Sequence, residues 1–242
     1  MGNGIAHVFA QSGYSVTMID REQGPLDKAL ARIAKNMDRQ INKGKLSEED
    51  KENALQRITT STDIVQGVAK ADVIIEVVSE NMAVKEAVLS AVDAAAKADA
   101  IIASNTSSIS ITKLASFTNR PERFIGMHFM NPVPVMKLIE VIRGYATSQE
   151  TMDTIIALSK AIGKVPVEAN DYPGFVANRI LIPMINEAIY TLHEGVAGVE
   201  EIDTVMMLGM AHPMGPLHLA DFIGLDVVLS IANVLYDGFG QG

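Results

Sequence analysis

Short apolar runs alternate with longer amphipathic segments along the first part of this 242-residue chain. Runs of strand length occupy 15–20, 72–78, 100–103, 124–130 and 137–142. Segments with helical spacing occupy 2–12, 25–42, 82–96 and 148–162. Such alternation is typical of βαβ units, so we predict an α/β fold with a doubly wound, mainly parallel sheet.

The pattern changes after the sequence Asp171-Tyr172-Pro173-Gly174. From Phe175 onward only long segments of helical spacing follow, and glycines and the sequence HPMGP at 212–216 separate them. We therefore predict two domains, an α/β domain over 1–170 and an all-helical domain over 171–242.

The composition of the chain argues against a disordered, nucleic-acid-binding, membrane or disulfide-bonded protein. Hydrophobic residues make up 48% of the chain and charged residues 20%, which excludes a disordered chain. The formal net charge of −9 argues against a nucleic-acid partner, because binding to a phosphate backbone needs a basic surface. The longest apolar segment, around 180–189, is interrupted by Pro183, Asn186 and Glu187, so we expect no membrane partner. The absence of cysteine excludes disulfides and fits a reducing cytoplasm, where we expect the protein to act.

The N-terminal residues resemble the later part of a dinucleotide-binding, or Rossmann, fingerprint. That fingerprint consists of a strand, a G-x-G-x-x-G turn, a helix and an acidic residue about twenty positions on. Here Gly2 and Gly4 open a helical segment, and Asp20 stands at the end of the next strand. An Asp at that place accepts hydrogen bonds from ribose hydroxyls and repels a 2′-phosphate, which favours NAD over NADP, although the neighbouring Arg21 weakens the preference. The same letters are equally consistent with glycines that permit helix packing and an Asp that caps a loop.

The first strand of that fingerprint and its first glycines do not precede Gly2. We therefore expect the chain to be truncated at its N-terminus, and also at its C-terminus. The missing glycines normally bring the backbone close to the pyrophosphate, so cofactor binding by the chain as it stands is an open expectation.

The stretch from Ser104 to Glu140 has the most specific chemistry. His128 lies near the end of an apolar run, a proline-rich turn (131–134) follows, and Glu140 lies in the next apolar run. Two strands folded back through that turn would place the imidazole beside the carboxylate. A carboxylate fixes the tautomer of a histidine and raises its basicity, as a proton-abstracting base requires. A lone histidine in a strand is more often a structural residue, and Glu140 alone would be an ordinary strand residue.

Four segments together resemble one family: SNTSS at 104–108, HFMNPVPVMKLIEV at 128–141, DYPGFVANRI at 171–180 and HPMGPLHLADFIGLD at 212–226. The chain resembles the 3-hydroxyacyl-CoA dehydrogenases, and within them the stand-alone 3-hydroxybutyryl-CoA type, from end to end and in family order. The resemblance implies a reversible, NAD-dependent oxidation of an (S)-3-hydroxyacyl-CoA to the 3-ketoacyl-CoA. Its stand-alone type points to a short acyl chain, such as that of 3-hydroxybutyryl-CoA.

The resemblance also implies roles for matching residues. His128 would take the hydroxyl proton and Glu140 would hold the imidazole, while Ser107 would bind the substrate oxygen and Asn178 would support the polarised substrate. Without the resemblance, Asn178 would be a surface amide within a helix. The other histidines, at 7, 193, 212 and 218, are expected to be structural or surface groups.

Further contacts are implied in the same way. The residues expected to line the cofactor cleft are Glu80, Lys85, Asn105 and Asn131, and Lys43 would meet the CoA moiety. Helix capping is an alternative explanation for 79–81, and a helix C-terminus with lysines around Gly44 explains the sequence at Lys43 without a ligand.

Five methionines gather in the helical part, at 184, 206, 207, 210 and 214. They could line a site for an acyl chain, but core or dimer packing explains them more simply. The resemblance implies a homodimer formed through the helical domain. Two rival functions stay open: a β-hydroxyacid dehydrogenase acting on a free acid, and a non-catalytic relative of crystallin type or an inactive fragment.

Overall fold

The computed structural model describes residues 1–240, which form two compact units. The first unit comprises Met1–Thr106 and Ser110–Asp171. The second begins at Tyr172 and also includes the short segment Ser107–Ile109.

The first unit contains two sheets. In the smaller sheet β1 (Val16–Ile19) pairs in parallel with β2 (Ile58–Ser61). The larger sheet has the order β3-β4-β5-β6-β7, and its strands are β3 (Val73–Glu76), β4 (Ile101–Ser104), β5 (Phe124–Phe129), β6 (Leu138–Arg143) and β7 (Val165–Asn170). Every pairing is parallel except that between β5 and β6. The predicted mainly parallel sheet is thus confirmed, with one antiparallel hairpin inside it.

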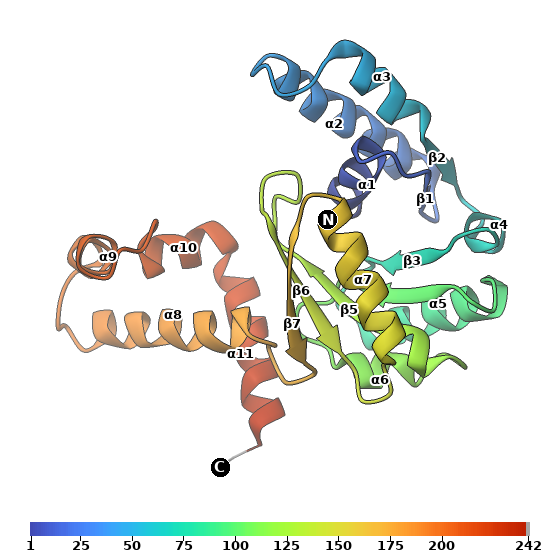
Figure 1. The fold of residues 1–242 in the computed structure, drawn as a ribbon. Helices are drawn as coiled ribbons and strands as arrows, with labels where there is room; N and C mark the ends of the chain where they lie inside the picture. Colours follow the sequence, from blue (N-terminus) through green and yellow to red (C-terminus); the bar gives the residue numbers. More distant parts are fainter. Residues whose placement is uncertain (241–242) are drawn as a thin grey trace. The chain divides into compact units, whose positions relative to one another are not determined.

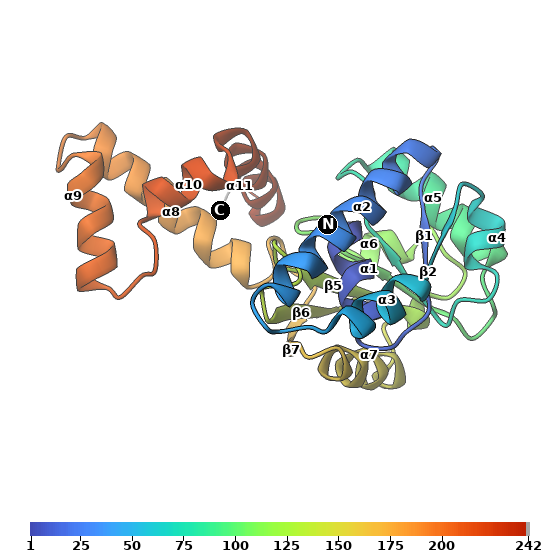
Figure 2. The same ribbon diagram turned by 90° about the horizontal axis from the view of Figure 1, so that it is seen from above.

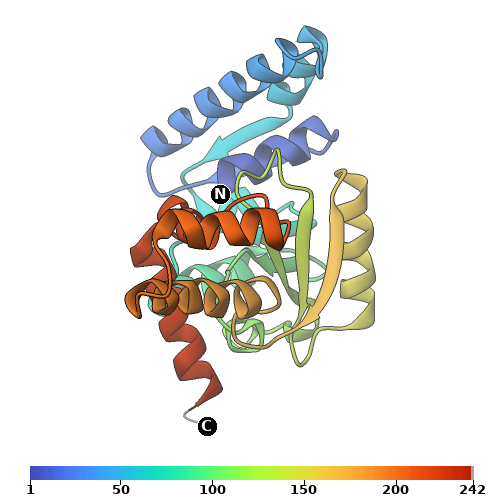
Figure 3. The same ribbon diagram turned by 90° about the vertical axis from the view of Figure 1, so that its left-hand side faces the viewer.

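Helices flank these strands. They are α1 (Gly2–Gln11), α2 (Gln23–Ile41), α3 (Glu48–Gln56), α4 (Ile64–Val68), α5 (Met82–Ala95), α6 (Ile111–Ala115) and α7 (Gln149–Ala161), with a short 3₁₀ turn at Pro121–Arg123. Helices α1, α2 and α3 lie together beside the two-stranded sheet (Figure 2). Helix α7 covers one face of β5, β6 and β7 (Figure 3). The four helices predicted from spacing are present, with ends that differ by one or two residues.

Two strands and three helices escaped the sequence pattern. Strand β2 reads ITTS and β7 reads VPVEAN, so neither is an apolar run. Strand β7 lies at the edge of its sheet, where a proline is tolerated because one side of the strand needs no ladder hydrogen bonds. Helices α3, α4 and α6 were missed because α3 is largely charged and the other two are only five residues long.

The main core of the first unit joins α1 and α7 to the larger sheet. Ile5 and Phe9 of α1 pack in one cluster with Ile125 and Met127 of β5 and with Ile155 of α7. Strand β5 is buried at all six positions, as expected for a strand covered on both faces. The core therefore fixes the inner strands of the sheet rigidly, including the strand that ends at His128 and Phe129.

The second unit is helical, as the sequence predicted. It consists of α8 (Ala177–His193), α9 (Val199–Thr204), a π-helical turn (Val205–Gly209), α10 (Pro216–Ile223) and α11 (Leu225–Phe239). Helix α8 contacts α9, α10 and α11, and Figure 1 shows α10 beside it. The carboxylate of Asp203 accepts hydrogen bonds from the backbone N–H groups of Leu217 and His218, which anchors the start of α10. Not all the helices are as long as the pattern suggested, since α9 and α10 are short.

The methionines of the helical unit do not form its core. Met207 and Met210 are exposed, and Met184, Met206 and Met214 are half-buried. The buried core consists instead of Ile182, Ile185, Ala220, Val228 and Leu235. Within residues 1–240 no single helix is long and apolar enough to cross a membrane; α10 and α11 reach that length and hydropathy only as a pair, which bends by 100°.

Candidate active site

The antiparallel hairpin of β5 and β6 brings the predicted histidine and carboxylate together. His128 and Glu140 are directly opposite each other in the register of the two strands. The Nδ1 atom of His128 lies 2.7 Å from Oε2 of Glu140, and both side chains are buried. The predicted juxtaposition is therefore confirmed. Because a carboxylate at Nδ1 fixes the tautomer that carries its proton there, the pair has the geometry of an oriented general base.

The turn between the two strands is held by a buried cation. The turn contains a cis peptide bond between Asn131 and Pro132. Lys164 donates hydrogen bonds to the carbonyl oxygens of Val133 (2.5 Å) and Met136 (2.7 Å), and burial lowers the pKa of its ammonium group. Lys164 was not among the predicted residues, and only its place at the start of β7 brings it to the turn.

The polar segment after β4 is anchored at both ends. At its start, Ser104 donates a hydrogen bond to Glu76 of β3 (2.7 Å). At its end, Asp171 accepts hydrogen bonds from Ser110 Oγ and from the backbone N–H groups of Ile111 and Thr112, at 2.7 to 3.0 Å. The segment between them, which contains the predicted Asn105 and Ser107, is therefore held in a fixed conformation.

Asn105 is hydrogen-bonded to β5, the strand that carries His128. Its Oδ1 atom accepts a hydrogen bond from the backbone N–H of Phe129 (2.9 Å), the residue after His128. The predicted cofactor residue thus also supports the end of β5.

Ser107 and Asn178 form a second pair, within the second unit. The side-chain amide of Asn178 donates a hydrogen bond to the carbonyl oxygen of Ser107 (3.0 Å), and both residues are half-buried. Asn178 stands at the start of α8 and not in its middle, and its amide has a specific backbone partner. The four predicted catalytic residues are divided between the units: His128 and Glu140 belong to the first, Ser107 and Asn178 to the second.

Glu80 and Lys85 meet in a cluster of charged groups between β3 and α5. Lys85 Nζ lies 3.5 Å from Glu80 and 2.9 Å from both carboxylate oxygens of Glu76. Lys85 is buried, whereas Glu80 is partly exposed and accepts a hydrogen bond from Thr106. The capping alternative holds for the next residue only, since Asn81 caps α5 through the N–H of Val84. Glu76 escaped the sequence analysis because one carboxylate in an apolar strand gives no signal of its partners.

Gly2, Gly4 and Asp20, which were predicted to belong to a dinucleotide site, differ in their surroundings. Gly4 packs closely against Val133, since a Cβ there would lie 3.0 Å from that side chain, so packing explains this glycine. A Cβ on Gly2 would meet nothing within 4 Å, so packing among the described residues does not explain Gly2, which begins α1. Asp20 follows β1 with its carboxylate exposed. An open helix N-terminus and an acidic residue after the neighbouring strand suit a dinucleotide.

Asn131 lies apart from the charged cluster, beside α1. It lines a small cavity of about 160 Å³ together with Met1, Asn3 and Gly4 from the start of α1 and Arg32 and Asn36 from α2. Lys43, the predicted CoA contact, is exposed just after α2, and Gly44 has a positive φ of 65° there. Helix α2 ends at Ile41 with Asn42 as its C-cap, so Gly44 lies in the turn after the helix and is not the residue that ends it. This does not decide whether Lys43 meets a ligand.

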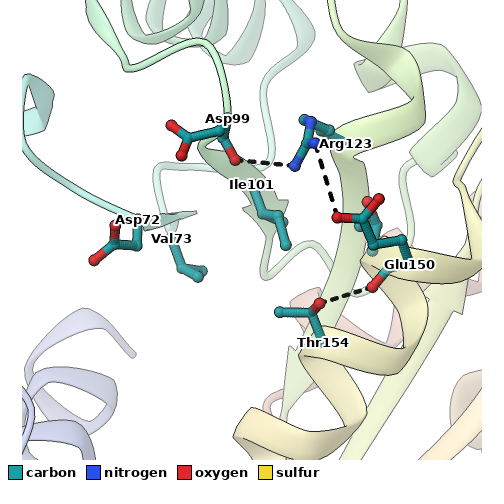
Figure 4. Close-up of a pocket in the computed structure, with 8 residues that line it drawn as sticks. Asp72, Val73, Asp99, Ile101, Arg123, Glu150 and Thr154 are labelled. Atoms are coloured by element: carbon teal, nitrogen blue, oxygen red, sulfur yellow. Dashed lines mark hydrogen bonds and ion pairs between the residues drawn. The ribbon is translucent and has the colours of Figure 1, made fainter.

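A larger cavity of about 290 Å³ opens at the other ends of the strands (Figure 4). Asp72 and Asp99 stand just before β3 and β4, and Arg123 stands just before β5. Arg123 donates a hydrogen bond to the carbonyl oxygen of Asp99, and it also pairs with Glu150 of α7. Of the predicted site residues within the described chain, none lines this cavity.

The remaining histidines have the structural or surface places expected of them. His7 is completely buried in α1, where Nε2 lies 3.0 Å from Oε1 of Gln11. Burial lowers its pKa, against the effect of neighbouring amide side chains. His193 and His218 are exposed, and His212 is half-buried.

Comparison with protein families identifies both units. The NAD-binding domain of 3-hydroxyacyl-CoA dehydrogenase matches residues 1–172, and the C-terminal domain of 3-hydroxyacyl-CoA dehydrogenase matches residues 174–242.

Individual relatives agree. A probable 3-hydroxybutyryl-CoA dehydrogenase of Bacillus subtilis is 52% identical over 241 residues, which are all of this chain and 84% of the relative. The mitochondrial hydroxyacyl-coenzyme A dehydrogenase of Homo sapiens is 43% identical over 96% of this chain and 76% of its own length. Among solved structures, the (S)-3-hydroxybutyryl-CoA dehydrogenase of Ralstonia eutropha superposes with a TM-score of 0.97 at 51% identity, over all of this chain and 85% of that one.

Proposed function

The chain belongs to the 3-hydroxyacyl-CoA dehydrogenase family, and we propose that His128 and Glu140 are the acid–base pair with which it works. It is an NAD-dependent oxidoreductase that interconverts (S)-3-hydroxyacyl-CoA and 3-ketoacyl-CoA. The observation that carries the proposal is the buried 2.7 Å contact between Nδ1 of His128 and Glu140, across two paired strands.

The two residues divide the work. Glu140 engages Nδ1, so Nε2 is the ring atom that takes the proton of the substrate hydroxyl. The imidazole gains a positive charge in that step, and the buried carboxylate stabilises this charge more strongly than water would. In the reverse direction the imidazolium returns the proton to the substrate oxygen.

When bound, NAD+ would supply the acceptor for the hydride that leaves C3 of the hydroxyacyl group, and NADH would supply the hydride in the reduction. Asp20, exposed after β1, would hold its ribose hydroxyls, and the start of α1 at Gly2 would meet its phosphates. Glu80 with Lys85, Asn105 and Asn131 completes the cofactor cleft. Ser107 binds the substrate oxygen and Asn178 holds the backbone of Ser107 in place.

The substrate is a short-chain acyl-CoA, as the names of the bacterial relatives suggest. Lys43, exposed in the turn after α2, meets the CoA moiety, because an anionic ligand needs a local positive charge on this acidic protein. We place the protein in the cytoplasm, in agreement with the absence of cysteine.

The helical unit forms a homodimer. Large apolar side chains are exposed on its helices, among them Ile180, Leu208, Phe222, Leu229 and Tyr236. Single exposed apolar residues need no explanation, but so many on one small unit favour a surface that a second copy covers. Sedimentation equilibrium tests this, and a monomer at micromolar concentration would contradict it.

The activity itself is tested by following NADH oxidation with acetoacetyl-CoA. We expect turnover with the CoA ester and none with free acetoacetate. Turnover of the free acid would favour a free β-hydroxyacid as substrate. Absence of both activities, together with absence of NADH binding, would favour a non-catalytic protein.

A further inference from the structure

Glu76, at the last position of β3, is the most fully engaged carboxylate in the charged cluster of Glu76, Glu80 and Lys85. Its side chain is 1% exposed. Its two oxygens accept hydrogen bonds from Lys85 Nζ (2.9 Å to each), from Ser104 Oγ (2.7 Å) and from the backbone N–H of Val78 (2.6 Å). Three separate segments, α5, β4 and the loop after β3, thus converge on one side chain.

The ammonium group of Lys85 links buried Glu76 to Glu80 at the surface. Lys85 is buried, so it presents no accessible charge itself, but it lies 3.5 Å from Glu80, whose side chain is 39% exposed. Thr106 donates a hydrogen bond to Glu80 at 2.9 Å. The position of Glu80 is therefore set from two sides, by Lys85 and by the segment after β4.

Glu76 reaches the histidine strand by a second route. The carbonyl oxygen of Glu76 accepts a hydrogen bond from the backbone N–H of Asn105 (2.9 Å), while its side chain holds Ser104. Asn105 in turn accepts a hydrogen bond from the N–H of Phe129. A continuous set of hydrogen bonds therefore joins Glu76 to the end of β5, one residue from His128.

We propose that Glu76 is a positioning residue of the cofactor cleft, which holds Lys85 and through it Glu80 in the orientation that the cofactor requires. This inference rests on the proposed function, because it takes Glu80 as a cofactor contact. A buried ion pair is seldom the most stable filling for a site, and replacement by apolar residues is often neutral or stabilising. The role of the Glu76–Lys85 ion pair is therefore to fix the orientation of Glu80, the charged side chain next to it.

The chain offers a matched control at the other end of α5. Asp93 is also a buried carboxylate, which pairs with Arg120 at 2.6 Å and accepts hydrogen bonds from Asn119. Neither of these two partners is a predicted site residue. Glu76→Gln and Asp93→Asn each remove one negative charge from a buried ion pair without changing the size of the side chain. A loss caused only by a weakened fold would appear in both variants.

The experiment measures NADH affinity by fluorescence titration, thermal stability, and turnover with acetoacetyl-CoA for wild type, Glu76→Gln and Asp93→Asn. We expect Glu76→Gln to weaken NADH binding about tenfold, as loss of a residue that orients a ligand group typically does. We expect Asp93→Asn to lose stability while its NADH affinity stays within about twofold of wild type.

A double-mutant cycle separates positioning from general damage. Because Glu76 acts through Lys85, Glu76→Gln should weaken NADH binding by less than about twofold further in a Lys85→Met background. Additive losses would overturn the inference, as would unchanged NADH affinity in Glu76→Gln or equal losses in the Asp93 control. If wild type neither binds NADH nor reduces acetoacetyl-CoA, the proposed function fails and this inference fails with it; an active wild type with an indifferent Glu76→Gln contradicts the inference alone.

Discussion

The two ends of the parallel strands β3, β4 and β5 differ in the burial and the hydrogen bonding of the polar side chains found there. At the carboxyl ends, Glu76, Ser104 and His128 are buried and hydrogen-bonded to other side chains. At the amino ends, Asp72 and Asp99 are exposed around an open cavity (Figure 4). Burying polar groups costs free energy unless they are paired, so a structure that buries several at one end has a use for them there. The comparison teaches that the polar side chains which lie on these strands themselves are buried and paired at the end that carries His128.

Removal of the proposed base should have the largest effect. His128→Gln is expected to lower kcat about a thousandfold, because general acid–base catalysis contributes about that much to such reactions. NADH affinity, measured by fluorescence titration, should stay near that of wild type. Turnover that survives the substitution would exclude His128 as the base. The carboxyl ends of the strands would then no longer be distinguished as the place of the active site.

Removal of the charge that orients this histidine should cost less. Glu140→Gln keeps the shape of the side chain but no longer stabilises an imidazolium, so we expect kcat to fall roughly a hundredfold. Steady-state kinetics with saturating acetoacetyl-CoA provide the measurement. A fall in KM alone, with kcat unchanged, would contradict the assigned role.

A buried carboxylate near the amino ends should matter for stability only. Asp93 accepts hydrogen bonds from Asn119 and Arg120, and Arg120 precedes β5. Burial alone would raise its pKa, but those hydrogen bonds and the guanidinium outweigh burial and lower it. Its contribution is therefore present above the ordinary pKa of an aspartate and is lost as the pH falls through the lowered value. Asp93→Asn should lower the free energy of unfolding at pH 7 by about 2 kcal/mol, measured by urea denaturation, with kcat unchanged.

His7 should make the fold sensitive to mild acid. Its pKa is lowered by burial, so below the ordinary value of 6.5 the unfolded chain binds a proton that the folded chain does not. Stability should therefore be constant with respect to this group above that pH and should decrease below it, by up to about 1.4 kcal/mol per pH unit. Urea denaturation between pH 7.5 and pH 5.5 measures the slope, and His7→Gln should flatten it. An unchanged slope would show that other groups cause it.

The smallest effect is expected at the exposed amino end. The side chain of Asp99 lies at the rim of the larger cavity, and it is the backbone oxygen of Asp99 that Arg123 contacts. Asp99→Asn should therefore change kcat by less than about twofold and the free energy of unfolding by less than about 0.5 kcal/mol. A marked loss of activity would break the contrast between the two ends.

The sequence by itself determined the class of fold and the pairing of His128 with Glu140. Alternating apolar and amphipathic segments specify a sheet with flanking helices, because side-chain periodicity decides which face of each element is buried. A proline-rich turn between two apolar runs specifies a hairpin, and the hairpin places the two residues opposite each other. These inferences depend on neighbours along the chain, which the sequence displays directly.

Only the tertiary structure decided which residues support that pair. Glu76 and Lys164 have no distinguishing neighbours in sequence, yet each meets its partners from distant segments: Ser104 is 28 positions from Glu76, and Val133 is 31 positions from Lys164. The strands β2 and β7 were likewise recognised only through their partners, since edge strands need little apolar surface of their own. Contacts between residues far apart in sequence follow from the order of strands in the sheet, and periodicity along one chain does not encode that order.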